Sequence, residues 1–238
     1  GSVWIGTYSG LAHWTQGRVD TYSTRTGLPS NIISSLMEDR DGNLWVGTSA
    51  GLGRITAGRL EVLTERDGLA SDWVLAIYED REGSVWVGTQ GGGLNCFADG
   101  TFTTYTTREG LSSNAPYAIY QDRKGDVWIG TESGGLNRFS HGAFSHFTTA
   151  DGLGHTAVWT VLEDARGALW AGTDGGLSRR DAAGGRFVTL RKADGLANDR
   201  IWALHEGRDG TLWIGTYAGL DALRDGWNNW LRDNRYFV

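Results

Sequence analysis

Cysteine and proline are almost absent from this chain. Its 238 residues include one cysteine, Cys96, and two prolines. A single cysteine excludes an internal disulfide, and the apolar stretch 94–97 around it predicts a packed side chain rather than a nucleophile. The fold must therefore be held by packing, which is compatible with a reducing or an oxidising compartment.

The chain also lacks an excess of positive charge and long apolar runs. Its formal charge of −6, with a pI near 5.3, leaves no basic stripe for DNA or RNA. No apolar run approaches the roughly 20 residues of a membrane span, so we expect no direct membrane insertion. No segment shows a sustained 3.6-residue apolar period, which argues against long helices.

Glycine and tryptophan, in contrast, are abundant and recur in one motif. There are 37 glycines and 12 tryptophans, and residues 42–48 read Gly-Asn-Leu-Trp-Val-Gly-Thr. The motif tryptophans are 41 to 43 residues apart: Trp4, Trp45, Trp86, Trp128, Trp170 and Trp213. A fixed period near forty residues is typical of structural units that stack on their neighbours.

Each period predicts four short strands. Runs such as 10–14, 18–23 and 32–39 are rich in β-branched and aromatic residues and are bounded by Gly, Asp and Asn. Strands joined by tight turns pair antiparallel, so each period of about 42 residues forms a four-stranded meander. Six meanders arranged radially predict an all-β, six-bladed β-propeller in a single domain, residues 1–238.

The positions of glycines and small residues predict which strand or turn of the blade each segment forms. Small residues recur in the first strand, where a propeller is most crowded: Ser35, Ala76, Ala118, Thr160 and Ala203. The tryptophan strand comes second and packs against the next blade. Glycines of the second turn, such as Gly93, and of the blade connections, such as Gly68, are expected to need positive φ.

The sequence also predicts how the ring closes. The chain starts at a second strand, and residues 231–238 align with 196–203, the start of an inner strand. We therefore expect Tyr236 to Val238 to pair beside Val3 to Thr7 in the N-terminal blade. The last connection departs from the others, because it is five residues shorter and lacks Asp-Gly.

One period carries a family resemblance. Residues 79–83, followed by 84–89 and by Gly-Gly-Leu at 92–94, resemble the two-component regulator propeller repeat, and the likeness recurs six times. The resemblance implies a bacterial sensor with its propeller outside the inner membrane, periplasmic or extracellular, and a cytoplasmic kinase, response-regulator or diguanylate cyclase output. Large sensors of this family carry about twice as many blades, so a fragment, a complete protein and an engineered ring all remain open.

Positions that differ between blades at one face are candidates for a binding site. By analogy, propeller ligands bind where the central channel opens, near the starts of inner strands and the second turns. Aromatic rings beside carboxylates and guanidinium groups suit a sugar or small polar anion. The candidate ligand-binding residues are Trp73, Tyr117, Glu132, His155, Trp159, Asp174, Arg200, Trp202, Tyr217 and Arg235.

Simpler alternatives stand beside this hypothesis. Tyr117, Trp159 and Trp202 could fill the mouth of the ring as core. Glu132 and Asp174 could act as acid and base, or could be solvated turn residues. The sequence 39–42 resembles the start of a calcium loop but lacks its later ligands, so it is interpreted as a hairpin, and we expect no metal site, cofactor or catalytic residue.

Three functions follow, in order of preference. The first is a non-enzymatic recognition module in signal transduction, which binds a small polar ligand or oligosaccharide. The second is a scaffold that contacts another protein or a second propeller. The third is a propeller lyase. Nucleic acid is not an expected partner.

Overall fold

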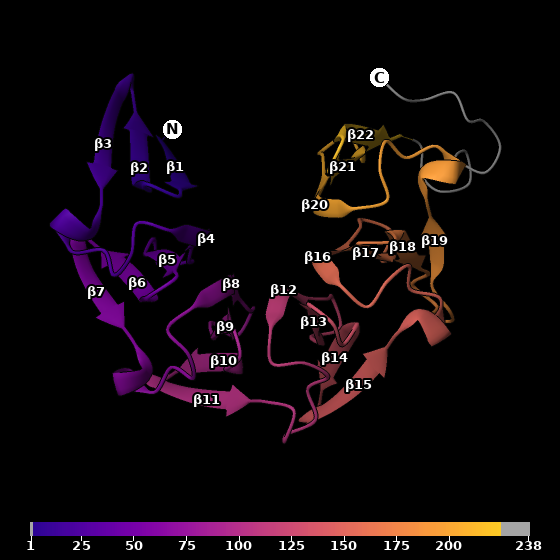
Figure 1. The fold of residues 1–238 in the computed structure, drawn as a ribbon, viewed down its shortest axis with the longest axis horizontal. Helices are drawn as coiled ribbons and strands as arrows, with labels where there is room; N and C mark the ends of the chain where they lie inside the picture. The colour runs from indigo at the N-terminus through magenta and orange to yellow at the C-terminus, as the bar shows by residue number, and fades with distance from the viewer. Residues whose placement is uncertain (1, 225–238) are drawn as a thin grey trace. The chain divides into compact units, whose positions relative to one another are not determined.

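The computed structural model describes residues 2–224, which form twenty-two β-strands and four short 310 turns (Figure 1). In this part of the chain, no helix has the length and apolar character needed to cross a bilayer. The prediction of an all-β chain is confirmed.

The first of two compact units spans Gly1–Pro116 and contains three antiparallel sheets. Their strands follow sequence order within each sheet: β1 (Ser2–Thr7), β2 (Gly10–Thr15) and β3 (Arg18–Tyr22); β4 (Ile33–Glu38), β5 (Leu44–Thr48), β6 (Gly51–Thr56) and β7 (Arg59–Leu63); β8 (Val74–Glu79), β9 (Val85–Thr89), β10 (Gly93–Ala98) and β11 (Thr101–Tyr105). Two 310 turns, η1 (Thr24–Thr26) and η2 (Glu65–Asp67), lie in the connections.

The second unit, Tyr117–Val238, repeats this arrangement. Its sheets are β12 (Pro116–Gln121, whose first residue closes the first unit), β13 (Val127–Thr131), β14 (Leu136–Ser140) and β15 (Ala143–Phe147); β16 (Val158–Glu163), β17 (Leu169–Thr173), β18 (Gly176–Arg180) and β19 (Val188–Leu190); β20 (Ile201–Glu206), β21 (Leu212–Thr216) and β22 (Gly219–Leu223). The turns η3 (Thr149–Asp151) and η4 (Lys192–Asp194) occupy its connections.

These six sheets are the blades of a six-bladed β-propeller, as the sequence predicts. Four sheets have four strands, while the described part of the first and last sheets has three. The predicted pairing of Tyr236 to Val238 beside Val3 to Thr7 involves residues outside the described part of the chain, so ring closure stays a prediction.

The second strand of each blade supplies the core. All five residues of β5, β9, β13 and β17 are buried, including Trp45, Trp86, Trp128 and Trp170. Each of these indoles donates its Nε1–H to the aspartate six residues earlier: Asp39 (2.8 Å), Asp80 (2.7 Å), Asp122 (2.9 Å) and Asp164 (2.8 Å). The same carboxylate also accepts backbone N–H groups of its hairpin, as Asp80 does from Glu82 and Ser84. The Asp-x-x-Gly hairpin thus satisfies the polar end of a buried indole.

In the first five blades the glycine of the Trp-x-Gly-Thr motif allows one blade to approach the next. A Cβ on Gly47 would lie 2.8 Å from Cγ1 of Val74 in the following blade, and one on Gly130 would lie 2.8 Å from the carbonyl oxygen of Val158. Neither glycine needs positive φ, so the constraint here is space. Gly68 and Gly93 do have positive φ, at 99° and 81°, as predicted for connection and turn glycines.

Glutamates at the ends of inner strands join neighbouring blades. Glu79 accepts the backbone N–H of Arg40 at 2.9 Å and its Nε–H at 2.7 Å. Glu163 accepts the backbone N–H of Arg123 at 2.8 Å, and Glu206 accepts that of Ala165 at 2.8 Å. In each case a hairpin of one blade donates to the inner strand of the next. We call this contact the turn-to-glutamate bond.

Most inner strands carry a β-bulge at their second position. In β16 the pairing passes from Val158↔Thr173 to Thr160↔Gly172, and in β20 from Ile201↔Thr216 to Ala203↔Gly215. β4 and β8 show the same irregularity. A bulge interrupts the alternation of side chains between the two faces of the sheet, so the bulged side chain points in a different direction than it would in a regular strand.

The last blade contains a buried carboxylate. Asp221 is 4% exposed, and burial raises the pKa of its carboxyl, although Oδ2 accepts the Ala197 N–H at 2.9 Å. Earlier blades place Asn95 and Asn137 here. Asn95 accepts the corresponding N–H of Ala70 at 3.0 Å and also donates its amide to surrounding oxygens.

We therefore expect Asp221→Asn to raise the free energy of unfolding by about 0.5–2 kcal/mol at pH 7, as repeat-consensus changes do. A carboxyl with a raised folded-state pKa stabilises fully below its unfolded pKa, and this contribution is lost as pH rises through the folded pKa. The advantage of the variant should hence disappear in acid. Denaturant melts at several pH values measure it, and a gap that persists below the ordinary aspartate pKa contradicts the argument.

Candidate functional site

The residues that follow Gly-Thr and those at the start of the inner strand lie side by side at one end of the blades. In four blades the residue after Gly-Thr donates its backbone N–H to the carbonyl of the residue that directly precedes the inner strand. Gln90 bonds to Trp73 (2.8 Å), Asp174 to Ala157 (3.2 Å) and Tyr217 to Arg200 (3.0 Å). This repeated bond brings the turn and the start of the inner strand together within these blades.

Three predicted aromatic residues of the second unit form one contiguous group, here called the aromatic cluster. Tyr117 is the second residue of β12, while Trp159 and Trp202 are the bulged residues of β16 and β20. The ring centroids of Tyr117 and Trp159 are 4.8 Å apart at 84°, and those of Trp159 and Trp202 are 5.0 Å apart at 34°. Rings from three successive inner strands therefore touch in a row.

Asp174 links this row to a guanidinium group. Its Oδ1 accepts the Nε1–H of Trp159 at 2.9 Å and forms an ion pair with Nε of Arg200 at 3.0 Å. Cζ of Arg200 lies 6.0 Å from the ring of Trp202 and 5.8 Å from that of Tyr217. Charge and aromatic surface thus alternate across two blades, within cation–π distance.

The group is accessible to solvent. Trp202 is 45% and Tyr217 is 72% exposed, and the side chain of Arg200 is 48% exposed. Tyr117 and Trp159 are half-buried. A role as core residues could explain Tyr117 and Trp159. It does not explain Trp202, Tyr217 and Arg200, which are more exposed.

The remaining predicted residues lie around this group or elsewhere. Glu132 is exposed; burial is the main cause that raises the pKa of the Tyr117 hydroxyl, and the charge of Glu132 adds to it. Trp73 is 52% exposed and belongs to the first unit. Arg235 lies outside the described residues.

His155 has a turn function that the sequence hypothesis did not foresee. Its Nδ1 accepts the backbone N–H of Ala157 at 3.0 Å. Ser30, Ser71 and Asn198 use side-chain oxygens for the same bond two residues on. An acceptor at this position caps the connection, so a local structural role accounts for His155.

Sequence reasoning identified these columns but missed the bulge that redirects Trp159 and Trp202. The sequence contains a signal for this bulge. Small residues and bulky variable residues occupy consecutive positions of the inner strand, and in a regular strand they would point to opposite faces. It also missed the indole–aspartate bond, although the spacing of six residues recurs in four blades. Among residues 2–224, no three His, Cys, Asp or Glu side chains gather as a metal site would require.

A family model described as the two-component regulator propeller matches residues 27–50, 68–91, 110–133, 152–175 and 195–218. Together these segments make up half of the chain, and each runs from a connection to the end of the tryptophan strand or just beyond. No curated protein sequence matches the chain.

Several solved structures are similar to this one. An extracellular domain described as that of a hybrid two-component system from B. thetaiotaomicron is 26% identical, with a TM-score of 0.80 over 92% of this chain and 32% of that one. The extracellular domain of a one-component system from the same organism is 21% identical, with a TM-score of 0.77 over 100% and 34%. Virginiamycin B lyase from Staphylococcus aureus is 19% identical, with a TM-score of 0.76 over 96% and 78%, and shows the fold alone. This chain spans about a third of the length of the two extracellular domains.

Proposed function

The chain belongs to the two-component regulator propeller family, and on that premise we propose that it is a non-enzymatic recognition propeller of a bacterial sensor. Its ligand is a small polar molecule or a carbohydrate, which binds at the aromatic cluster. The similarity to extracellular domains supports a location outside the cytoplasm, in the periplasm or beyond the cell. The signalling output then belongs to a separate domain or partner.

The observation that carries this proposal is the junction of Trp159, Asp174 and Arg200. A sugar ring has an apolar face that an indole can cover and hydroxyl groups that a carboxylate and a guanidinium can bind. Here the Asp174–Arg200 pair lies directly beside the two indoles of the cluster. The pairing also holds Arg200 in place before a ligand arrives, which lowers the entropy lost on binding.

The same contacts hold the Asp174 carboxylate in one orientation. Its Oδ1 accepts from Trp159 and pairs with Arg200. A carboxylate that is fixed in this way can orient a ligand by accepting hydrogen bonds at its second oxygen.

The test is a thermal-shift screen of the chain with oligosaccharides and small polar molecules. A ligand at a hundredfold excess over its Kd should add about 2.7 kcal/mol to stability. We expect that shift to disappear in the double variant Trp159→Ala, Trp202→Ala. Trp14→Ala is the matched control, because Trp14 is an exposed tryptophan (41%) of β2 in the first unit.

Two results would overturn the proposal. The first is a shift that survives in the double variant, which would place the ligand elsewhere. The second is a library without any shift, which would favour the scaffold function. In that case a protein partner whose interface buries more than about 1,000 Å² would be expected on this face.

A further inference from the structure

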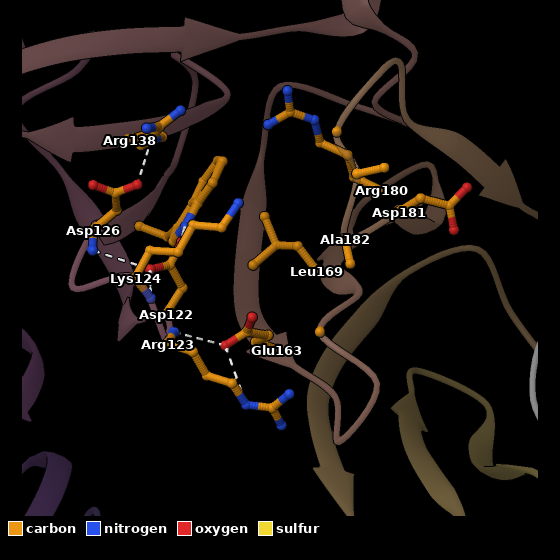
Figure 2. Close-up of a pocket in the computed structure, with 14 residues that line it drawn as sticks. Asp122, Arg123, Lys124, Asp126, Arg138, Glu163, Leu169, Arg180, Asp181 and Ala182 are labelled. Atoms are coloured by element: carbon orange, nitrogen blue, oxygen red, sulfur yellow. Dashed lines mark hydrogen bonds and ion pairs between the residues drawn. The ribbon is translucent and has the colours of Figure 1, made fainter.

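A cavity of about 410 Å³ lies within the second unit, between the sheets β12–β15 and β16–β19. Lys124, Arg138, Glu163, Leu169 and Arg180 are among its lining residues (Figure 2). Glu163 ends β16, whereas Trp159 of the aromatic cluster stands near its start. The cavity is therefore a separate place, at the other end of the inner strand.

Arg180 occupies a position that is apolar in every other blade. It pairs with Leu169, the first residue of the tryptophan strand. The residues in the same register elsewhere are Trp14, Ile55, Phe97, Phe139 and Leu223. Since the propeller repeat needs no charge at this position, the arginine calls for another explanation.

The guanidinium of Arg180 has aromatic support but no acidic partner among the described residues. Its Cζ lies 4.7 Å from the ring of Phe147 and 5.9 Å from that of Phe187, and Nε donates to the Gly185 carbonyl at 2.8 Å. Burial lowers its pKa, the nearby charge of Arg138 lowers it further, and Asp151 opposes them. An arginine stays charged in proteins, and among the described residues Arg180 forms no ion pair, although the charge of Asp151 acts on it from farther away.

The turn beside Arg180 is also unusual. Six residues, 181–186, separate Arg180 from Phe187, whereas four, 56–59, separate the corresponding Ile55 and Leu60. The longer turn contributes to the cavity, because Ala182, Ala183 and Gly184 form one of its walls. The same blade therefore contributes both the charge and the wall.

Lys124 brings a second positive charge to the opposite side of the cavity (Figure 2). It stands in the hairpin position that carries Asp41, Glu82 and Asp209 in three other blades. Four carboxylates line the cavity, and each has other partners. Asp126 pairs with Arg138 at 2.8 Å, Asp181 pairs with Arg179, Glu163 accepts the N–H of Arg123 at 2.8 Å, and Asp122 accepts the indole N–H of Trp128 at 2.9 Å. None of the four forms an ion pair with Arg180 or Lys124, so these two cations can face a ligand.

We propose that this cavity binds a small organic anion, whose carboxylate or phosphate group lies between Arg180 and Lys124 and whose apolar part lies over Leu169. Arginine and lysine both bind such groups by charge-assisted hydrogen bonds. The volume falls in the range of small-molecule sites. The proposal is independent of the function assigned to the aromatic cluster.

Isothermal titration of the full chain with two probes, phenyl phosphate and benzoate, tests the site. Inorganic phosphate controls for charge without an apolar part, and benzyl alcohol controls for the ring without charge. We expect at least one aryl anion to bind about tenfold or more tightly than either control, and the stronger of the two identifies the preferred acidic group.

The variants use residues that sibling blades already tolerate. Arg180→Leu installs the residue of Leu223, and Lys124→Glu installs that of Glu82, so both variants should fold. Each should weaken binding about tenfold or more, because a bond to a charged group is lost. Arg166→Glu makes the same charge change at the same hairpin position of the next blade and should alter Kd by less than about twofold.

Clear results would overturn the proposal. They are equal affinity for the aryl anions and benzyl alcohol, equal loss in the Arg166→Glu control, or unchanged binding in a folded Arg180→Leu variant. Failure of both aryl anions to bind at millimolar concentration would also overturn it. Circular dichroism of each variant ensures that a loss of binding is not a loss of folding.

Discussion

Replacing Trp128 with alanine is expected to lower the free energy of unfolding by about 3–5 kcal/mol. The indole is 4% exposed and packs in a core with Leu136, Val158 and Phe187. Alanine would leave a cavity, and it would also remove the donor that bonds to Asp122 at 2.9 Å. Denaturant unfolding followed by circular dichroism measures the effect.

Two companion variants separate the causes. Trp128→Phe keeps an aromatic ring and loses the N–H donor, so it should cost less than alanine does. Trp14→Ala removes a tryptophan that is 41% exposed and should cost under about 1 kcal/mol. Equal costs for Trp128→Ala and Trp14→Ala would contradict the assignment of the tryptophan strand to the core.

Gly130→Val is expected to destabilise the chain by roughly 3 kcal/mol or more, at the upper end of overpacking effects. Its first side-chain carbon would lie 2.8 Å from both the carbonyl oxygen and Cγ1 of Val158, and 3.1 Å from Cβ of Ala118. A backbone oxygen cannot rotate away as a side chain can, so the sheet that contains β16 would have to move.

Thermal and denaturant melts measure this cost. Gly130→Ala should fall between the wild type and the valine variant, because it adds the first carbon only. Ile129→Val, at the neighbouring fully buried position, controls for a change in the same strand and should cost about 0.5–1.5 kcal/mol. A valine variant as stable as the wild type would show that neighbouring blades are not closely packed here.

The repeat made most of the fold predictable. A motif that recurs at a fixed spacing defines where each blade begins, and turn glycines define where its strands end. The sequence predicts positive φ for Gly68 and Gly93, and the structure confirms it. The motif glycines were harder to explain, because their reason is the close approach of a residue some thirty positions away, as Val158 is to Gly130.

Of the two candidate sites, the sequence predicts one and not the other. Comparison of blades identified Trp159, Asp174 and Arg200 as variable positions at one face, and the structure brings these three into contact. The sequence analysis did not predict the cavity around Arg180, although this arginine stands at a position that is apolar in the other blades. Its meaning depends on a wall formed by a longer turn and on Lys124 of another sheet, and the sequence alone does not place these together.

The turn-to-glutamate bond has a consequence for how such a chain changes over time. The second and fourth blades each carry an arginine hairpin that donates to the next blade, and Glu79, Glu163 and Glu206 accept from the blade before. A repeat that has both the hairpin donor and the glutamate acceptor can be duplicated or deleted as a whole. The blades that then become neighbours still have a donor facing an acceptor. Interfaces of this kind make stability a sum over adjacent pairs. Blade number is then free to drift by unequal recombination, while single substitutions such as Arg180 give one blade a chemistry that its siblings lack.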